Sequence, residues 1–243
     1  MNTLTVGDLS CTLRYSNKRR TIGIEIDRNG QLIVSCRPDV PTERLEEVIH
    51  NKRWWIHEKL LEKEALSPAP PAKEFVSGEG FYYLGRSYRL KLTDDSAGEP
   101  ALRLYQSRFL LQRGQRSQGR DLFIQWYRQR LKTLLELLVP ELAQRIAIVP
   151  DSVQVRELGY RWGSCSEQGK LYFHWRLAML PKTMIEYVVI HELIHLIEHR
   201  HSPDFWERVE RVAPDFEQRK QWLAEHGAEY DLIRRDELQA PEP

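Results

Sequence analysis

The sequence predicts an α+β protein, in which a β-rich N-terminal part precedes a core made of a short sheet and one apolar helix. Segments 11–37 and 75–113 read as short strands separated by turn residues. The stretch "KTMIEYVVIHELIHLIEHR" has apolar side chains on nearly every side at helical spacing, which is typical of a buried helix. We therefore expect three segments: residues 1–113 as a β-rich region with one helix, 114–147 as a connecting helix, and 148–243 as the core.

Composition describes a globular chain with almost balanced charge. Of 243 residues, 36 are Lys or Arg and 35 are Asp or Glu, so the net charge of +1 does not favour nucleic acid or an acidic partner. Cys11, Cys36 and Cys165 are widely spaced and form no disulfide framework, which favours a reducing compartment. Because no apolar run has the length of a membrane helix, we expect a cytoplasmic protein that does not enter a membrane.

The elements of the first two segments follow from turn and helix signals. "RTIGIEID" and "QLIVSCR" are expected strands, joined at the turn pair Asn29-Gly30. Pro41 suits the start of a helix over residues 42–65. A second hairpin is expected around residues 84–86. The run "GRDLFIQWYRQRLKTLLELLVPELAQRI" predicts a long helix, kinked or restarted at Pro140.

The core segment begins with two expected strands. "VQVRELG" is the first, the loop "YRWGSCSEQGK" follows, and "LYFHWRLAMLP" is the second. We expect residues 171–176 to form an edge strand along which a substrate could lie. Pro181 then stands at the entrance to the apolar helix.

Ionisable groups inside that apolar helix need a chemical reason, because burying them is costly unless they are paired or bind metal. His191 and His195 are four residues apart and share one helical face, so both imidazoles can bind one zinc ion. Glu192 lies beside that face and can act as general base on a water. The HExxH pattern therefore predicts zinc-dependent hydrolysis, in which Glu192 takes a proton from the attacking water and returns it to the leaving amine.

A catalytic zinc usually has three protein ligands, so a third is needed. His199 continues the same helical row, but such a row does not converge on one ion. His201 follows the expected helix end, and Ser202-Pro203 has the signature of the start of a new helix, where the chain can turn back. We therefore predict His201 as the third ligand, with Glu207 or Glu210 as weaker alternatives.

Three segments together resemble the YgjP-like metallopeptidase family, a relative of the SprT-like zincins: "RWGSC", "LYFHWRLAMLP" and "YVVIHELIHLIEHRHSPDFW". "YSNKRRTIGIEIDRNGQLIVSCR" and "NKRWWIHEKL" also look like the family's N-terminal part. The resemblance implies a zincin-like core, zinc ligands at His191, His195 and His201, and Glu192 as the base. His174 departs from the Asn that relatives commonly carry, which puts the role of this position in doubt.

Several further residues have two interpretations. Arg161 can orient a substrate carboxylate or phosphate, or pair with a nearby glutamate, and Tyr160 or Arg161 could contact a developing oxyanion. Trp162 and Cys165 are expected mainly to pack beneath the metal helix.

Peptide or protein is the expected substrate, and two alternatives remain. The first is a metal-dependent hydrolase of nucleotide phosphoanhydrides (a pyrophosphatase), although no Walker A loop is present. The second is a nucleic-acid-binding protein with a non-catalytic zinc, which would use basic residues such as Arg19 and Arg20.

Overall fold

The computed structural model describes residues 2–7, 9–26, 31–53, 56, 73–158 and 161–232. The chain divides into two compact units, Met1–Ala69 and Pro70–Ala240. Both boundaries that we predicted, after residues 113 and 147, fall inside the second unit. The second group of strands and the long helix therefore belong to the same body as the HExxH segment.

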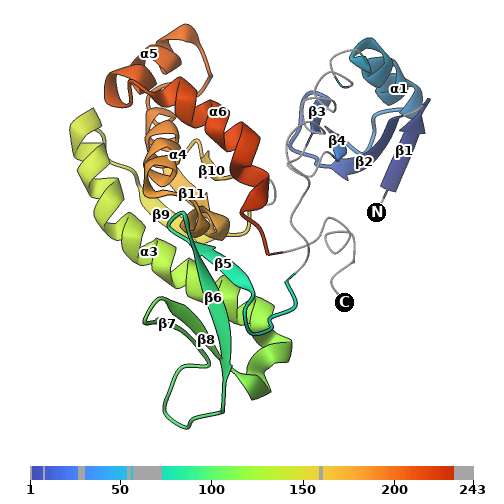
Figure 1. The fold of residues 1–243 in the computed structure, drawn as a ribbon. Coiled ribbons are helices and arrows are strands. Elements are labelled where there is room, and N and C mark those ends of the chain that lie inside the picture. Colours follow the sequence, from blue (N-terminus) through green and yellow to red (C-terminus); the bar gives the residue numbers. More distant parts are fainter. Residues whose placement is uncertain are drawn as a thin grey trace. The chain divides into compact units, whose positions relative to one another are not determined.

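The first unit contains a four-stranded sheet and helix α1 (Figure 1). Its strands are β1 (Asn2–Val6), β2 (Leu9–Tyr15), β3 (Gly23–Ile26) and β4 (Leu32–Cys36), in the order β1-β2-β4-β3. The central pair β2–β4 is parallel, and the two outer pairs are antiparallel. Apolar side chains of the sheet and of α1 (Thr42–Asn51) form a separate small core: Leu9, Cys11, Leu32, Val34, Cys36, Leu45, Ile49 and Ile56.

The two strands expected around residues 21–37 are present as the antiparallel pair β3–β4, whereas β1 was not expected. The turn pair Asn29-Gly30 lies outside the described residues. Helix α1 begins at the predicted residue but ends at Asn51, before the predicted end at residue 65. Positions 54, 55 and 57–65 of that prediction also lie outside the described residues.

The second unit begins with another four-stranded sheet of the same order. Its strands are β5 (Gly80–Tyr83), β6 (Arg86–Thr93), β7 (Leu102–Tyr105) and β8 (Arg108–Gln112), arranged β5-β6-β8-β7 with a parallel central pair. The predicted hairpin is present, and its turn residues Leu84 and Gly85 have φ of 48° and 78°. Their backbone N–H groups donate to Ala178 and Met179 carbonyls at 2.9 Å, which ties the hairpin to the segment before the HExxH helix.

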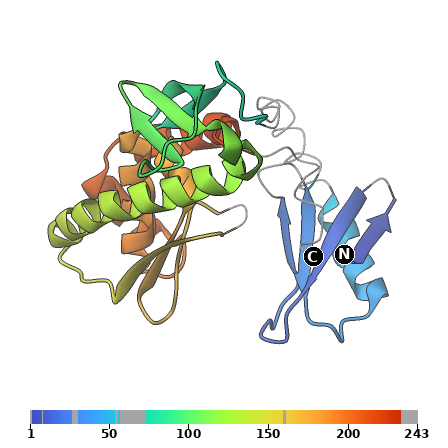
Figure 2. The ribbon, with the colours of Figure 1, turned by 90° about the horizontal axis from the view of Figure 1, so that it is seen from below.

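Helix α3 (Gly119–Ile146), preceded by the 3₁₀ turn η1 (Arg113–Gln118), passes between this sheet and strands β9–β11 (Figure 2). It continues through Pro140, so the expected restart there is wrong. The hydroxyl of the fully buried Tyr127 donates to the Tyr82 carbonyl of β5 at 2.6 Å. Because its apolar face enters the main core, α3 is a central element rather than a connection between domains.

The third sheet has strands β9 (Ser152–Arg156), β10 (Gly163–Cys165) and β11 (Lys170–His174), in the order β10-β11-β9. Strand β11 is therefore central in the described sheet, and our expectation that residues 171–176 form an edge strand is wrong. Strand β11 ends at His174, and Trp175–Met179 form the 3₁₀ helix η2. The strand stops there because the His174 side chain accepts the Arg176 backbone N–H and caps η2.

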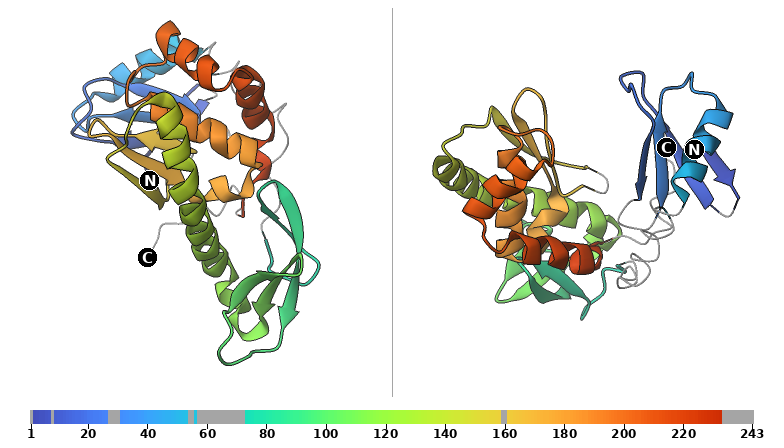
Figure 3. Two further views of the ribbon diagram at one scale, coloured as in Figure 1. Left: turned by 90° about the vertical axis from the view of Figure 1, so that its left-hand side faces the viewer. Right: turned by 90° about the horizontal axis from the view of Figure 1, so that it is seen from above.

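Helix α4 (Lys182–Ile194) packs against α3, β10, α5 (Pro203–Val212) and α6 (Phe216–His226), which is followed by η3 (Gly227–Glu229). Figure 3 shows α4–α6 near one end of α3 and the sheet β5–β8 near the other. Side chains from α3, β11, η2 and α4 share one core. Within the described residues, no helix has the combination of length and apolar character needed to cross a bilayer.

Candidate metal centre

The C-terminal end of α4 brings three histidines together. His191 lies in its last turn and His195 directly follows its last residue. The chain then turns, and Ser202 caps α5 by accepting the Phe205 backbone N–H at 3.2 Å. This cap is at the predicted position, and it places His201 beside His191 and His195.

The three Nε2 atoms point at one another. They are 3.2 Å apart for His191–His195, 3.1 Å for His195–His201 and 3.0 Å for His191–His201. The Nδ1 of His195 lies 3.1 Å from the Glu198 carbonyl, which can only accept, so Nδ1 carries the proton and Nε2 a lone pair. Three imidazole nitrogens this close, with at least one bare lone pair, form a donor set for a cation.

Burial keeps these imidazoles neutral. Burial, together with the neighbouring charges of His195, His201 and Lys220, lowers the pKa of His191 to about 3. Burial also lowers the pKa of His195 and of His201, with Lys220 adding to the effect on His201. Neutral imidazoles are ligands that zinc accepts well, so the residues present fit the ion that the sequence predicts. One feature is less usual for a ligand: Nδ1 of His191 is buried and has no hydrogen-bond partner among the described residues.

Aromatic rings hold the histidines in place from one side. The ring centroid of buried Phe205 lies 4.9 Å from that of His191, 4.6 Å from His195 and 4.9 Å from His201. Trp206 stacks on His201 at 5.5 Å. Both aromatic residues come from α5, so the same turn that positions His201 also supplies the surface on which the cluster rests.

Glu192 is only 6% exposed and lies against β10. A Cβ placed on Gly163 would be 2.6 Å from Glu192 Cγ and 2.7 Å from its Oε1, so only glycine permits this approach. Burial raises the pKa of Glu192 to about 8, although the charge of Arg161 opposes the rise. Within the described part of the chain, no hydrogen-bond donor reaches the carboxylate, which therefore remains available to a water or substrate in the cavity.

A cavity of about 980 Å³ opens over the histidines and Glu192. Arg161, Trp162, Cys165 and His199 line it, so all four lie near the site, although His199 is not part of the three-histidine cluster. Arg161 Nη1 lies 3.4 Å from the Ser164 hydroxyl. Burial and the charge of Glu192 raise the pKa of Cys165 to about 11, which disfavours a thiolate ligand. Tyr160 lies outside the described residues.

His174 belongs to a separate polar network. Its Nε2 lies 2.5 Å from Glu157 Oε1, and Trp175 Nε1 donates to Glu157 Oε2 at 2.8 Å. Burial alone would raise the pKa of Glu157, but the contacts with His174 and Trp175 and the charge of Arg176 lower it to about 2. His174 is fully buried and is not part of the cavity lining, so its contacts are structural.

The cavity lining includes residues that our sequence reasoning did not propose, among them Tyr187 on α4, and Lys220 and Leu223 on α6. Tyr187 precedes His191 by four residues and therefore shares its helical face, a signal that was available in the sequence. Lys220 and Leu223 are brought in by the packing of α6 on α4, for which no local pattern exists.

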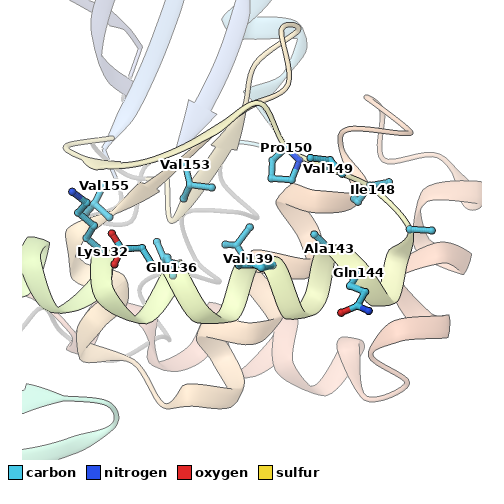
Figure 4. A pocket seen from close by; sticks show the side chains of 13 residues that line it. Lys132, Glu136, Val139, Ala143, Gln144, Ile148, Val149, Pro150, Val153 and Val155 are labelled. Carbon is cyan, nitrogen blue, oxygen red and sulfur yellow. The ribbon is translucent and has the colours of Figure 1, made fainter.

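A second hollow lies apart from the histidines, between α3 and the segment that leads into β9 (Figure 4). Its volume is about 670 Å³, and its lining is mostly apolar, including Val139, Ala143 and Val153. Lys132 and Glu136 are the only ionisable residues in that lining. This surface therefore offers none of the chemistry found at the histidine cluster.

Three neutral imidazoles and a buried carboxylate in one open cavity are the groups that a metal-dependent hydrolase needs. A family model described as YgjP-like, metallopeptidase domain matches residues 20–226. The chain therefore belongs to the YgjP-like metallopeptidase family, as the sequence resemblance indicated.

Among solved structures, the chain is similar to the metallopeptidase zymogen of Pyrococcus abyssi abylysin, at 24% identity and a TM-score of 0.35. The similarity covers 37% of this chain and 90% of that one. A comparison with curated protein sequences gave no match.

Proposed function

We propose that this protein is a zinc-dependent metallopeptidase in which His191, His195 and His201 hold the ion and Glu192 is the general base. The observation that carries the proposal is the convergence of three Nε2 atoms, 3.0–3.2 Å apart, in the same cavity as a buried carboxylate that receives no hydrogen bond from the described residues. A site for structural zinc normally fills all four positions with protein ligands. Three histidines beside an open cavity favour a catalytic site instead.

The position of Glu192 suits proton transfer. When bound, zinc supplies a Lewis acid that polarises the substrate carbonyl and makes a water more acidic. Burial raises the pKa of Glu192 to about 8, which makes its carboxylate a stronger base. With zinc held by the three histidines, that pKa would fall again, which favours the ionised form that can accept a proton. Glu192 takes one proton from the attacking water. It then gives that proton to the leaving amine as the carbon–nitrogen bond breaks.

Three neighbouring groups position Glu192, His195 and the substrate in this proposal. Gly163 allows the carboxylate to lie directly on β10, and the Glu198 carbonyl holds the His195 ring in the tautomer that turns a lone pair toward the cluster. Arg161 lines the same cavity and affects the pKa of Glu192, so its guanidinium lies where it can orient a substrate carbonyl or carboxylate.

The test is Glu192→Gln, which keeps the shape of the side chain but removes the base. We expect zinc content to stay near one ion per chain, while peptide cleavage falls by about 10²–10⁴-fold. Glu186→Gln is the matched control, because Glu186 lies on the same helix, outside the cavity lining, and pairs with Lys182 and Arg219. Both variants and the wild type should be offered a peptide library, an unfolded protein and a panel of nucleoside triphosphates.

Each outcome separates the candidate functions. Peptide cleavage that is lost in Glu192→Gln and kept in Glu186→Gln supports the proposal. Triphosphate hydrolysis without peptide cleavage would replace it with the nucleotide hydrolase. If no substrate is turned over and the wild type binds DNA in a salt-sensitive manner that Arg19→Ala and Arg20→Ala abolish, the protein is a binding module.

A further inference from the structure

One end of the cavity is formed by two helices that pack on each other. Tyr187 and Val188 come from α4, and Lys220 and Leu223 come from α6. The Tyr187 ring meets the His191 ring edge-on, with centroids 6.1 Å apart. This end of the cavity therefore begins directly beside the histidine cluster and has both apolar and polar walls.

The hydroxyl of Tyr187 has no hydrogen-bond acceptor among the side chains and backbone that the structure describes. The side chain is only 5% exposed, and no hydrogen bond to the hydroxyl is found among the described residues. Among the described residues, the hydroxyl is also not one of the buried side-chain nitrogens and oxygens that lack a hydrogen-bond partner, so it is not sealed off from the cavity. It therefore faces the cavity. A phenol is protonated at neutral pH, so a hydrogen-bond donor is presented there.

Lys220 presents a positive charge to the same space. Its ammonium lies 4.5 Å from the centroid of Trp206, which itself stacks on His201. The neighbouring Arg219 is paired differently, with Asp215 at 2.9 Å and Glu186 at 3.9 Å. No carboxylate in the described part of the chain forms an ion pair with Lys220, whose charge lowers the pKa of His191 and His201.

We infer that this end of the cavity binds the side chain next to the cleaved bond and selects glutamate. Val188 and Leu223 would contact the apolar stem, and the Tyr187 hydroxyl and Lys220 ammonium would donate to the carboxylate. The inference rests on the proposed function, since it names the substrate class of the same site. The two donors would recognise different features of the substrate side chain. The hydroxyl distinguishes a side chain with an acceptor from one without, and the ammonium distinguishes a carboxylate from an amide.

The experiment uses peptides that differ at one residue, which is Glu, Gln or Met, placed on either side of the cleaved bond. For the wild type we expect kcat/KM to fall in the order Glu, Gln, Met, by roughly 10-fold or more for loss of the charge and about 3–10-fold for loss of the acceptor. Lys220→Met should abolish the preference for Glu over Gln. Tyr187→Phe should reduce the preference for Gln over Met.

Lys91→Met and Tyr105→Phe are matched controls on exposed positions of β6 and β7, and both should keep the wild-type order. Zinc content and melting temperature of all four variants should match those of the wild type. Equal kcat/KM for the three peptides, or an order that neither cavity variant changes, would overturn the inference.

A binding measurement separates this inference from the proposed function. In calorimetry, zinc-loaded Glu192→Gln protein should bind the Glu peptide roughly 10-fold more tightly than the Gln peptide. The double variant Glu192→Gln, Lys220→Met should bind the two peptides equally. If the wild type cleaves no peptide but this difference is present, the proposed function fails and the assigned selectivity stands. If cleavage depends on Glu192 but binding does not discriminate, the selectivity is wrong and the function stands.

Discussion

Gly163→Ala tests how closely the proposed base must be held. The new Cβ would lie 2.6 Å from Cγ, 2.7 Å from Oε1 and 2.9 Å from Cδ of Glu192. Ordinary carbon–carbon contacts are about 3.5–4.0 Å, so the Glu192 side chain must move by about 1 Å. A displacement of that size at a reacting group can cost about 10²-fold in rate. Overpacking at such a site also costs about 1–3 kcal/mol of stability.

The assay combines peptide cleavage, zinc content and thermal unfolding. We expect kcat to fall by about 10–100-fold while zinc remains bound, because the three histidines come from α4 and the loop before α5 rather than from β10. Gly80→Ala is the control. It is also a strand glycine, but its Cβ would meet only the Ser87 hydroxyl, at 2.8 Å, and that side chain can rotate away. If Gly163→Ala keeps full kcat and full stability, the account of Glu192 lying against β10 is refuted.

Two other predictions concern the third ligand and the polar network. In a competitive chelator titration, His201→Ala should weaken zinc binding far more than His199→Ala, because His201 belongs to the three-histidine cluster and His199 does not. Equal losses would contradict the assigned ligand set. The contacts of Glu157 hold its pKa at about 2 instead of the ordinary 4.5, so its contribution to stability is present above about pH 4.5 and is lost as the pH falls toward 2. Glu157→Gln should flatten the decline in melting temperature of the metal-free protein over that range, by a small amount because the carboxyl is half-exposed, and an unchanged decline would show that another group controls it.

Local patterns predicted the parts of the site that lie on one helix or one turn. His191, Glu192 and His195 follow from spacing along α4, and the Ser202-Pro203 helix start correctly indicated the turn that brings His201 back. The hairpin at Leu84-Gly85 also followed from turn residues. Each of these features depends on residues within about ten positions of one another.

Features set by distant contacts were missed or wrong. Strand β11 is central in its sheet, whereas we had expected an edge strand. The prediction failed because the side-chain pattern of a strand does not show which neighbouring strands form hydrogen bonds with its backbone. The two four-stranded sheets share one strand order without any sequence repeat that we found. The boundary expected after residue 113 falls inside the second compact unit, where the burial of Tyr127 and its hydrogen bond to β5 join the second sheet to the core.

The sequence by itself determined the chemistry available to this protein: a family membership, two histidines one helical turn apart, a carboxylate beside them, and a turn with a third histidine. Only the tertiary structure decided which groups face the cavity and in what state. Burial against Phe205 and β10 lowers the pKa of His191 and raises that of Glu192. The packing of α6 on α4 adds Lys220, which is 29 positions after His191 in the sequence. Electrostatic environment depends on what surrounds a group in space, and spacing along the chain does not encode it.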